Sequence, residues 1–354
     1  PPVLMTGATF TDWLYRSLVF LVISCPCALV ISIPLGFFAG IGAASKRGIL
    51  VKGGNYLEAL SEVDTIVFDK TGTLTKGIFE VTEINSMNDF RKEELLRAGA
   101  YAESYSNHPI ALSILNAYGA EIDQTLISEY RETAGNGIKT RIAGKDILVG
   151  NASLLTDSGI LFEPSESLGT IVYIAINNLY AGYIVINDEI KPDARKAIEE
   201  LKSLGIKKTV MLTGDLKPAA DSIGEQLNLD EVYAELLPAE KVAVFEQLQS
   251  QESDRNRLAY VGDGINDAPV LARSDIGIAM GGLGSDAAIT AADVVIMNDK
   301  PSRIPEAIRI ARRTRLIVYQ NIIIALGIKA VFLVLGALGV AEMWEAVFAD
   351  VGVT

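Results

Sequence analysis

Two long apolar stretches place the strongest limit on what this chain can fold into. Residues 14–40 and residues 316–340 are rich in aliphatic and aromatic side chains, and each stretch is long enough to cross a lipid bilayer. Hydrophobic residues make up 49% of the chain, yet they collect at its two ends, while charged residues are spread through the middle. The sequence therefore predicts a polar globular region between membrane-spanning helices.

Basic residues lie on the same side of both stretches. Lys46 and Arg47 follow the first stretch, and four arginines precede the second: Arg309, Arg312, Arg313 and Arg315. The positive-inside rule therefore predicts that the polar region lies in the cytoplasm, although Arg16 at the far end of the first stretch reduces the asymmetry. We expect an integral protein of the plasma (inner) membrane. A signal peptide is the alternative for residues 14–40, but they lack a basic leader and end in basic residues instead of a cleavage site.

The polar middle has the pattern of an α/β protein with a parallel sheet. Four short apolar runs, at residues 65–68, 209–212, 258–261 and 276–280, alternate with helical patterns, and three of them end in acidic or small polar residues. More than a hundred residues separate the first run from the second, which is too many for one crossover connection. We expect an inserted α+β domain there, with a helical stretch at 93–120 and strands near 137–149 and 171–186.

The first of these runs leads into the sequence DKTGTLT, which begins at Asp69. A carboxylate at the end of a strand is most often a cap or a turn residue, but here it has the company that phosphoryl transfer requires. Asp263 and Asp267 lie in GDGINDAP at another strand end, where their oxygens suit a hard cation such as magnesium. Thr213 and Lys241 can supply a hydroxyl and an ammonium group to a phosphate. We expect Asp69 to be exposed to attack.

Together, DKTGTLT, the TGD sequence at 213–215 and GDGINDAP resemble the signatures of P-type ATPases. The resemblance implies that Asp69 is phosphorylated by ATP and that Asp69, Thr71, Asp263 and Asp267 hold magnesium. It also implies that Lys241 stabilises the phosphate and that the remaining motif residues assist catalysis: Lys70, Thr213, Gly214 and Asp215. The implied fold is a haloacid-dehalogenase-like phosphorylation domain with an inserted nucleotide-binding domain, flanked by transmembrane helices.

That resemblance divides the chain into five parts. We predict a transmembrane helix at 1–45, the phosphorylation domain at 46–79 and 188–308, the nucleotide-binding domain at 80–187, and further transmembrane helices at 309–354. The last apolar segment, residues 344–353, is too short to cross a bilayer, so we expect a truncated helix there. No Thr-Gly-Glu sequence occurs, so the actuator domain and the first membrane helices of such a pump are expected to lie outside this chain, as partners of it.

Residues 106–109 resemble the Ser-x-His-Pro motif of heavy-metal P-type ATPases, whose histidine helps to orient adenine. His108 is the single histidine of the chain, and a lone histidine is more often a surface or core residue than a functional one. The resemblance implies a nucleotide site with these members: Glu103, His108, Pro109, Gly135, Gly137 and Asn151. The alternative for the two glycines is an ordinary role in turns.

The first apolar stretch contains Cys25-Pro26-Cys27, the only two cysteines of the chain. A disulfide between residues i and i+2 would be strained, so we expect free thiols or metal ligands. Pro26 can unwind the helix and let both thiols face one site, where thiolates favour soft or borderline metals. Two inert cysteines beside a kink are the alternative.

Cys-Pro-Cys in this helix resembles the heavy-metal pumps, and Lys329 and Asp350 resemble the lysine and aspartate of the zinc, cadmium and lead subclass. The resemblance implies that Cys25, Cys27 and Asp350 bind the transported ion and that Lys329 is its counter-charge. The Tyr-Asn and Met-x-x-Ser-Ser motifs of the copper subclass are not intact, since Gln320 follows Tyr319.

The sequence thus predicts ATP-driven export of zinc, cadmium or lead. A copper(I) pump is the main alternative, and a soluble phosphatase of the same superfamily or a nonenzymatic metal-binding membrane protein are weaker ones. A net charge of −13 without clustered basic residues excludes nucleic acid as a partner.

Overall fold

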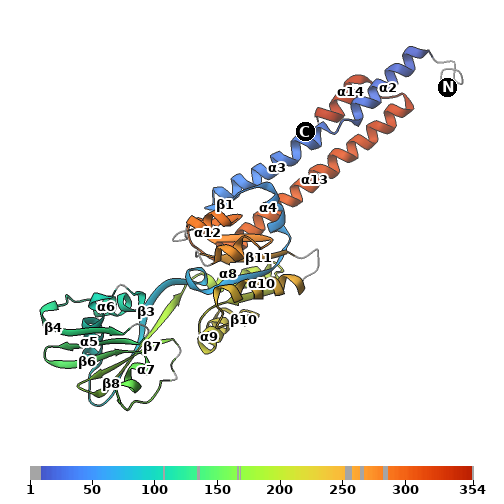
Figure 1. The fold of residues 1–354 in the computed structure, drawn as a ribbon. Helices are drawn as coiled ribbons and strands as arrows, with labels where there is room; N and C mark the ends of the chain where they lie inside the picture. The colour runs from blue at the N-terminus through green and yellow to red at the C-terminus, as the bar shows by residue number, and fades with distance from the viewer. Residues whose placement is uncertain are drawn as a thin grey trace.

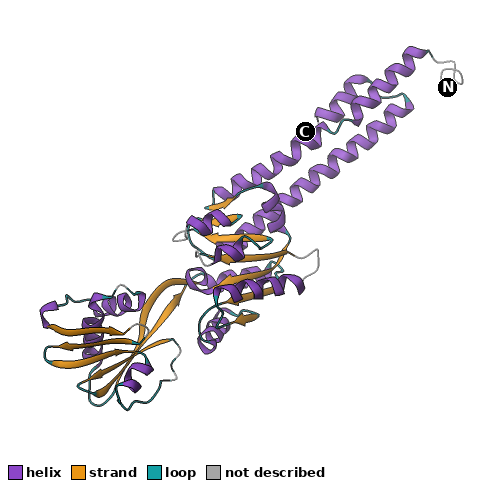
Figure 2. Cartoon of the chain, viewed as in Figure 1, coloured by secondary structure: helices purple, strands orange, loops and turns teal. Residues whose placement is uncertain are grey.

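In a computed structural model, four helices form a rod that projects from a globular region with two separate sheets (Figure 1). The structure describes residues 9–106, 108–133, 136–165, 167, 169–251, 257–263, 267–281 and 286–352. The larger sheet lies next to the rod, and the smaller sheet lies at the opposite end of the molecule (Figure 2).

The rod contains α2 (Phe10–Ser24), α3 (Cys27–Ser45), α13 (Arg303–Leu338) and α14 (Met343–Val347). The segments Phe10–Ser45 and Arg303–Leu338 are each long and apolar enough to cross a membrane. The first predicted span is not one continuous helix, because the backbone leaves helical geometry at Cys25 and Pro26. The third apolar segment forms α14 and a π-helical turn, η5 (Phe348–Gly352).

The larger sheet has seven strands in the order β1-β13-β12-β11-β2-β9-β10. All neighbouring strands are parallel except β1 and β13. The four predicted runs became β2 (Val63–Asp69), β9 (Lys208–Leu212), β11 (Arg257–Gly262) and β12 (Ile276–Met280). Three short strands escaped prediction, because three residues give too little periodicity to detect: β1 (Ile49–Val51), β10 (Glu231–Tyr233) and β13 (Val294–Ile296).

Helices cover both faces of this parallel sheet, so its central strands are buried on both sides. Every residue of β2 is buried, and its apolar side chains belong to the cores on the two faces. The helices of this domain are α4 (Gly54–Ser61), α8 (Ala194–Ser203), α9 (Lys217–Leu227), α10 (Pro238–Gln251), α11 (Ala268–Leu271) and α12 (Asp286–Ala291). The first turns of α13 complete it, since Ile304, Ala307 and Ile308 lie in the same core.

The smaller sheet is antiparallel, in the order β3-β8-β7-β6-β5-β4. Its strands are β3 (Thr75–Ser86), β4 (Ile127–Thr133), β5 (Gly137–Ile142), β6 (Lys145–Gly150), β7 (Thr170–Ile176) and β8 (Leu179–Ile190). The predicted helical stretch is instead two helices, α5 (Lys92–Ala102) and α6 (Pro109–Tyr118), joined by the 3-10 turn η2 (Glu103–Tyr105), because Pro109 cannot continue a helix from α5. A second 3-10 turn, η3 (Gln124–Leu126), and α7 (Ala152–Asp157) complete this domain.

β3 and β8 connect the two sheets. Both strands are long, with Thr75 paired to Ile190 at the end next to the larger sheet and Ser86 paired to Gly182 at the other end. The domain limits predicted at 79/80 and 187/188 fall inside these strands and stay predictions. The paired strands form a two-stranded hinge between the domains (Figure 1).

Candidate functional site

Three carboxylates meet at the carboxyl ends of β2 and β11. Asp69 ends β2, Asp263 follows β11, and Asp267 precedes α11; one oxygen from each lies within 4.8 Å of the others. Lys241 of α10 forms ion pairs with Asp69 and with Asp267, the second at 3.4 Å. The structure therefore brings together four of the residues singled out in the sequence.

Asp69 is buried, with 5% of its surface exposed, so the expectation of an exposed carboxylate was wrong. The reason is that Lys241 covers it from α10 while Asp267 lies beside it. Burial and the nearby Asp267 raise the pKa of Asp69 to about 7, against the opposing effect of Lys241. Burial and Asp267 likewise raise the pKa of Asp263 to about 6.

The pKa values of Asp69 and Asp263 are raised because their negative charges are poorly solvated and are repelled by the carboxylate of Asp267. A divalent cation would relieve both costs, and an all-oxygen donor set is the kind that magnesium prefers. Lys241 supplies a single positive charge, which it shares between Asp69 and Asp267. Asp267 also accepts a hydrogen bond from the Tyr260 hydroxyl at 2.9 Å. The carboxylate cluster thus fits a hard divalent ion.

The DKTGTLT segment forms a tight turn, η1 (Lys70–Leu74), that presents Asp69 to the other strand ends. Gly72 has φ +72°, and a Cβ atom there would lie 1.7 Å from Oδ2 of Asp263. Only glycine combines this positive φ with the absence of a Cβ atom. Thr71 has extended φ/ψ within this turn and is half-buried.

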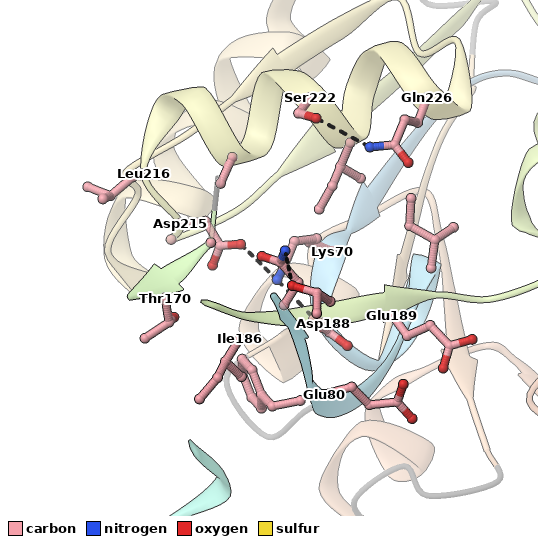
Figure 3. A pocket seen from close by; sticks show the side chains of 18 residues that line it. Lys70, Glu80, Thr170, Ile186, Asp188, Glu189, Asp215, Leu216, Ser222 and Gln226 are labelled. Carbon is pink, nitrogen blue, oxygen red and sulfur yellow. Dashed lines mark hydrogen bonds and ion pairs between the residues drawn. The ribbon is translucent and has the colours of Figure 1, made fainter. Parts of the chain in front are cut away.

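The ammonium group of Lys70 lies between the carboxylates of Asp188 and Asp215 (Figure 3). It forms ion pairs with Asp215 at 2.7 Å and with Asp188 at 3.5 Å. Thr213 is buried, and its hydroxyl accepts a hydrogen bond from the backbone N–H of Asp215, across the exposed Gly214. The TGD sequence therefore supports Lys70, while Thr213 follows Leu212, the residue paired with Asp69.

Asp188 and Lys191, at the hinge end of β8, were missed in the sequence. Asp188 accepts a hydrogen bond from Thr75, and Lys191 donates to the carbonyl of Gly72 and pairs with Asp299 at 3.0 Å. Both side chains are almost fully buried, and charged residues that are this buried are normally paired. In the sequence DEIKP, the only sign of these buried charges is that Asp188 and Lys191 have opposite charges and lie three residues apart.

A cavity of about 580 Å³ lies between the hinge strands and α9 (Figure 3). Lys70 of η1, Asp188 of β8 and Asp215 after β9 line it, and Thr170 lines it from β7. The cavity therefore lies between the two domains, next to the turn that follows Asp69.

Three of the candidate nucleotide residues, Glu103, Gly137 and Asn151, lie near the point where β4 ends and β5 begins. Burial and the neighbouring Glu132 raise the pKa of Glu103 to about 7, and Glu132 pairs with Ile138 of β5. Asn151 precedes α7, and its backbone N–H donates to the carbonyl of Asn136, next to Gly137. Gly135 lies outside the described residues.

Four of the candidate nucleotide residues also have a local structural role. His108 precedes α6 and accepts the N–H of Ile110 at Nδ1, while Pro109 is the first residue of that helix. Asn151 accepts the N–H of Leu154 in the same way. Gly137 has φ +136°, and a Cβ atom would lie 2.3 Å from the carbonyl oxygen of Val149. Their assignment to a nucleotide stays a prediction.

In the rod of helices, Cys25 and Cys27 are joined by a disulfide, contrary to the expectation of free thiols. The break at Pro26 explains the difference, since extended backbone at Cys25 turns both sulfur atoms to the same side. Lys329 is buried within α13, with 6% of its surface exposed. Asp350 lies in η5, and its side chain is outside the described part of the structure.

Comparison with known proteins agrees with this geometry. Residues 63–275 match the haloacid dehalogenase-like hydrolase family, and the chain belongs to that family. Its similarity to metal-transporting P-type ATPases covers all of its length: it is 61% identical to a cadmium, zinc and cobalt-transporting ATPase of Bacillus subtilis and 56% identical to a zinc-transporting ATPase of Synechocystis sp.. The chain spans about half of these relatives, 50% and 49%.

A crystal structure of a zinc-transporting PIB-type ATPase in an E2.Pi state has the same fold. The TM-score is 0.89 at 38% sequence identity, over 100% of this chain and 58% of that one. The predicted fold class and the resemblance to heavy-metal P-type ATPases are therefore confirmed. The names of these proteins favour zinc and cadmium over copper; lead stays a prediction.

Proposed function

We propose that this chain forms the phosphorylation, nucleotide-binding and ion-binding parts of an ATP-driven exporter of zinc or a related soft divalent metal ion. The carboxylate cluster around Asp69 supports the proposal most strongly, because a buried aspartate at a strand end beside Lys241 can accept a phosphoryl group. The observed identity to cadmium and zinc transporters supports the choice of metal.

In the proposed reaction, one carboxylate oxygen of Asp69 attacks the γ-phosphorus of ATP. A new oxygen–phosphorus bond forms, the bond between the γ-phosphorus and the bridging oxygen breaks, and ADP leaves with that electron pair. Water later cleaves the acyl phosphate and releases inorganic phosphate. Asp69, Asp263, Asp267 and the backbone of Thr71 would hold magnesium, which supplies positive charge against the phosphate oxygens.

Other residues of this chain would position the reacting groups and neutralise their charge. Lys241 neutralises Asp69 before transfer and can follow the phosphate afterwards, since it already lies between Asp69 and Asp267. Lys70, held by Asp215 and Asp188, keeps the loop that carries Asp69 fixed against the hinge. ATP bound on the smaller domain, near Glu103, His108 and Gly137, would reach Asp69 when the hinge closes.

For the transported ion we propose a site made by Cys25, Cys27 and Asp350, with Lys329 as counter-charge. The two sulfur atoms lie on the same side of the break at Pro26, so that after reduction both thiolates can bind one metal ion. The buried lysine in a membrane helix supports a functional role for Lys329, because such a charge is costly. Cadmium and lead suit the same donors as zinc.

We further propose that the rod crosses the plasma membrane with both domains in the cytoplasm, where the basic flanks at Lys46, Arg47 and Arg309 would lie. An actuator domain and additional membrane helices, beyond the half of the relatives that this chain spans, would complete the transport cycle.

Acid-stable labelling of the full-length protein from ATP labelled at the γ-phosphate tests the proposed chemistry. We expect a labelled band for the wild type and no label for Asp69→Asn. Asp64→Asn, at the other end of the same strand, is the matched control and should keep the label. A labelled Asp69→Asn protein would contradict the proposal.

A further inference from the structure

Arg312 of α13 binds the backbone carbonyls of three residues of the larger domain, two of them on the connection between α4 and β2. Its guanidinium group donates to the carbonyl of Ser61 at 3.3 Å, to that of Val63 at 3.2 Å and to that of Leu204. Ser61 ends α4, Val63 begins β2, and Leu204 follows the last residue of α8. A positive charge is favourable here, because the carboxyl ends of two helices point their carbonyls toward it.

The neighbouring turn of α13 holds the same junction. Arg315 forms an ion pair at 2.6 Å with Glu62. Glu62 lies between Ser61 and Val63, whose carbonyls bind Arg312. Residues 61–63 are therefore attached to α13 by two arginines. β2 starts at this junction and runs, fully buried, to Asp69 at its other end.

Above this junction, α13 continues without interruption into the membrane rod. The helix is 36 residues long, and Lys329 lies 17 residues after Arg312, which corresponds to about 25 Å along a helix axis. Below the junction, Ala307, Ile308 and Ala311 are packed in the core of the larger domain. Arg312 thus lies where a rigid helix passes from the domain core to the membrane segment.

We propose that Arg312 is a positioning residue that makes β2, and with it Asp69, follow displacements of α13 in the membrane. This inference rests on the proposed function, since it requires metal binding in the rod to promote phosphorylation. Packing alone can let a helix slide over a sheet, whereas three hydrogen bonds from one guanidinium group fix the helix to specific backbone atoms. Arg312 touches neither the metal nor the phosphate.

The test is zinc-stimulated ATP hydrolysis by the full-length protein in proteoliposomes, divided by hydrolysis without zinc. Arg312→Gln should lower this ratio about fivefold or more, while hydrolysis without zinc stays within about twofold of the wild type. Arg312→Lys keeps the charge but not the three-way geometry and should lower the ratio less. Arg313→Gln, on the exposed neighbour, is the matched control and should leave the ratio unchanged.

An unchanged ratio in Arg312→Gln, with zinc stimulation intact in the wild type, would overturn the role of Arg312 and leave the proposed function standing. A parallel loss of both activities, together with a lower Tm, would show a structural role only and would also overturn it. Should Arg312→Gln fail to fold, the ratio measured for Arg312→Lys decides. A wild-type protein without any metal stimulation would overturn both proposals.

Discussion

At the scale of single residues, Gly72 is a tightly constrained position of η1, the turn that follows Asp69. It has a positive φ, and the carboxylate of Asp263 occupies the space that a Cβ atom would need. A substitution there must move either the loop that carries Asp69 or the carboxylate proposed to hold magnesium. A substitution of Gly72 should therefore impair the placement of these two carboxylates more than it lowers the stability of the protein.

We predict that Gly72→Ala lowers the rate of phosphorylation from ATP by roughly 100-fold or more, because it displaces Asp263 or Asp69. Gly144→Ala is the matched control: Gly144 has a similar φ of +78°, but nothing lies within 4 Å of a Cβ atom there. It should cost about 1–2 kcal/mol of stability and leave phosphorylation intact. Rapid-quench labelling measures both rates, and similar losses in the two variants would contradict the prediction.

Glu103 gives a second residue-scale prediction. Burial raises its pKa from 4.5 to about 7. The Glu103 carboxyl group is therefore harder to ionise in the folded state than in the unfolded chain. Its unfavourable contribution begins above the unfolded pKa, grows as the pH rises and is complete above about pH 7. Glu103→Gln should therefore stabilise the protein by about 2 kcal/mol more at pH 8.5 than at pH 5.5. Chemical denaturation at the two pH values tests this, and equal effects would refute it.

At the scale of secondary-structure elements, the sequence revealed the apolar central strands of the larger sheet and hid its three-residue strands, and it also missed β3 and β4 of the smaller sheet. β2, β9 and β11 are apolar runs that lead into characteristic polar residues, and β12 is an apolar run that follows Asp275, whereas β1 and β13 owe their pairing to neighbours far along the chain. The break at Pro26 was expected, but its effect on the two sulfur atoms was not, because it depends on the conformation of Cys25.

That break leads to a prediction. Pro26→Ala should let α2 and α3 join into one helix, which turns the two cysteine side chains apart and lowers zinc binding by the reduced protein. Pro34→Ala is the control, since Pro34 lies inside α3 and the helix continues through it. Metal content per protein molecule after equilibration with zinc measures the effect. Undiminished binding in Pro26→Ala would count against a site at these cysteines.

At the scale of the whole molecule, two sites with different chemistry lie in different parts of one chain. Motif resemblance identified the carboxylate cluster and Lys241 because short, local sequences specify them. The contacts that join the domains could not be predicted in this way: Lys70 with Asp188, and Arg312 with the carbonyls near β2, each link residues more than a hundred positions apart. These contacts depend on the topology of the chain and leave little trace in local sequence.

The central claim is that phosphorylation of Asp69 drives metal transport. Uptake of zinc into inside-out membrane vesicles containing the full-length protein tests it most directly. We predict ATP-dependent accumulation of zinc in wild-type vesicles and none in vesicles with Asp69→Asn at equal protein content. Accumulation at the wild-type rate in the Asp69→Asn vesicles would contradict the account.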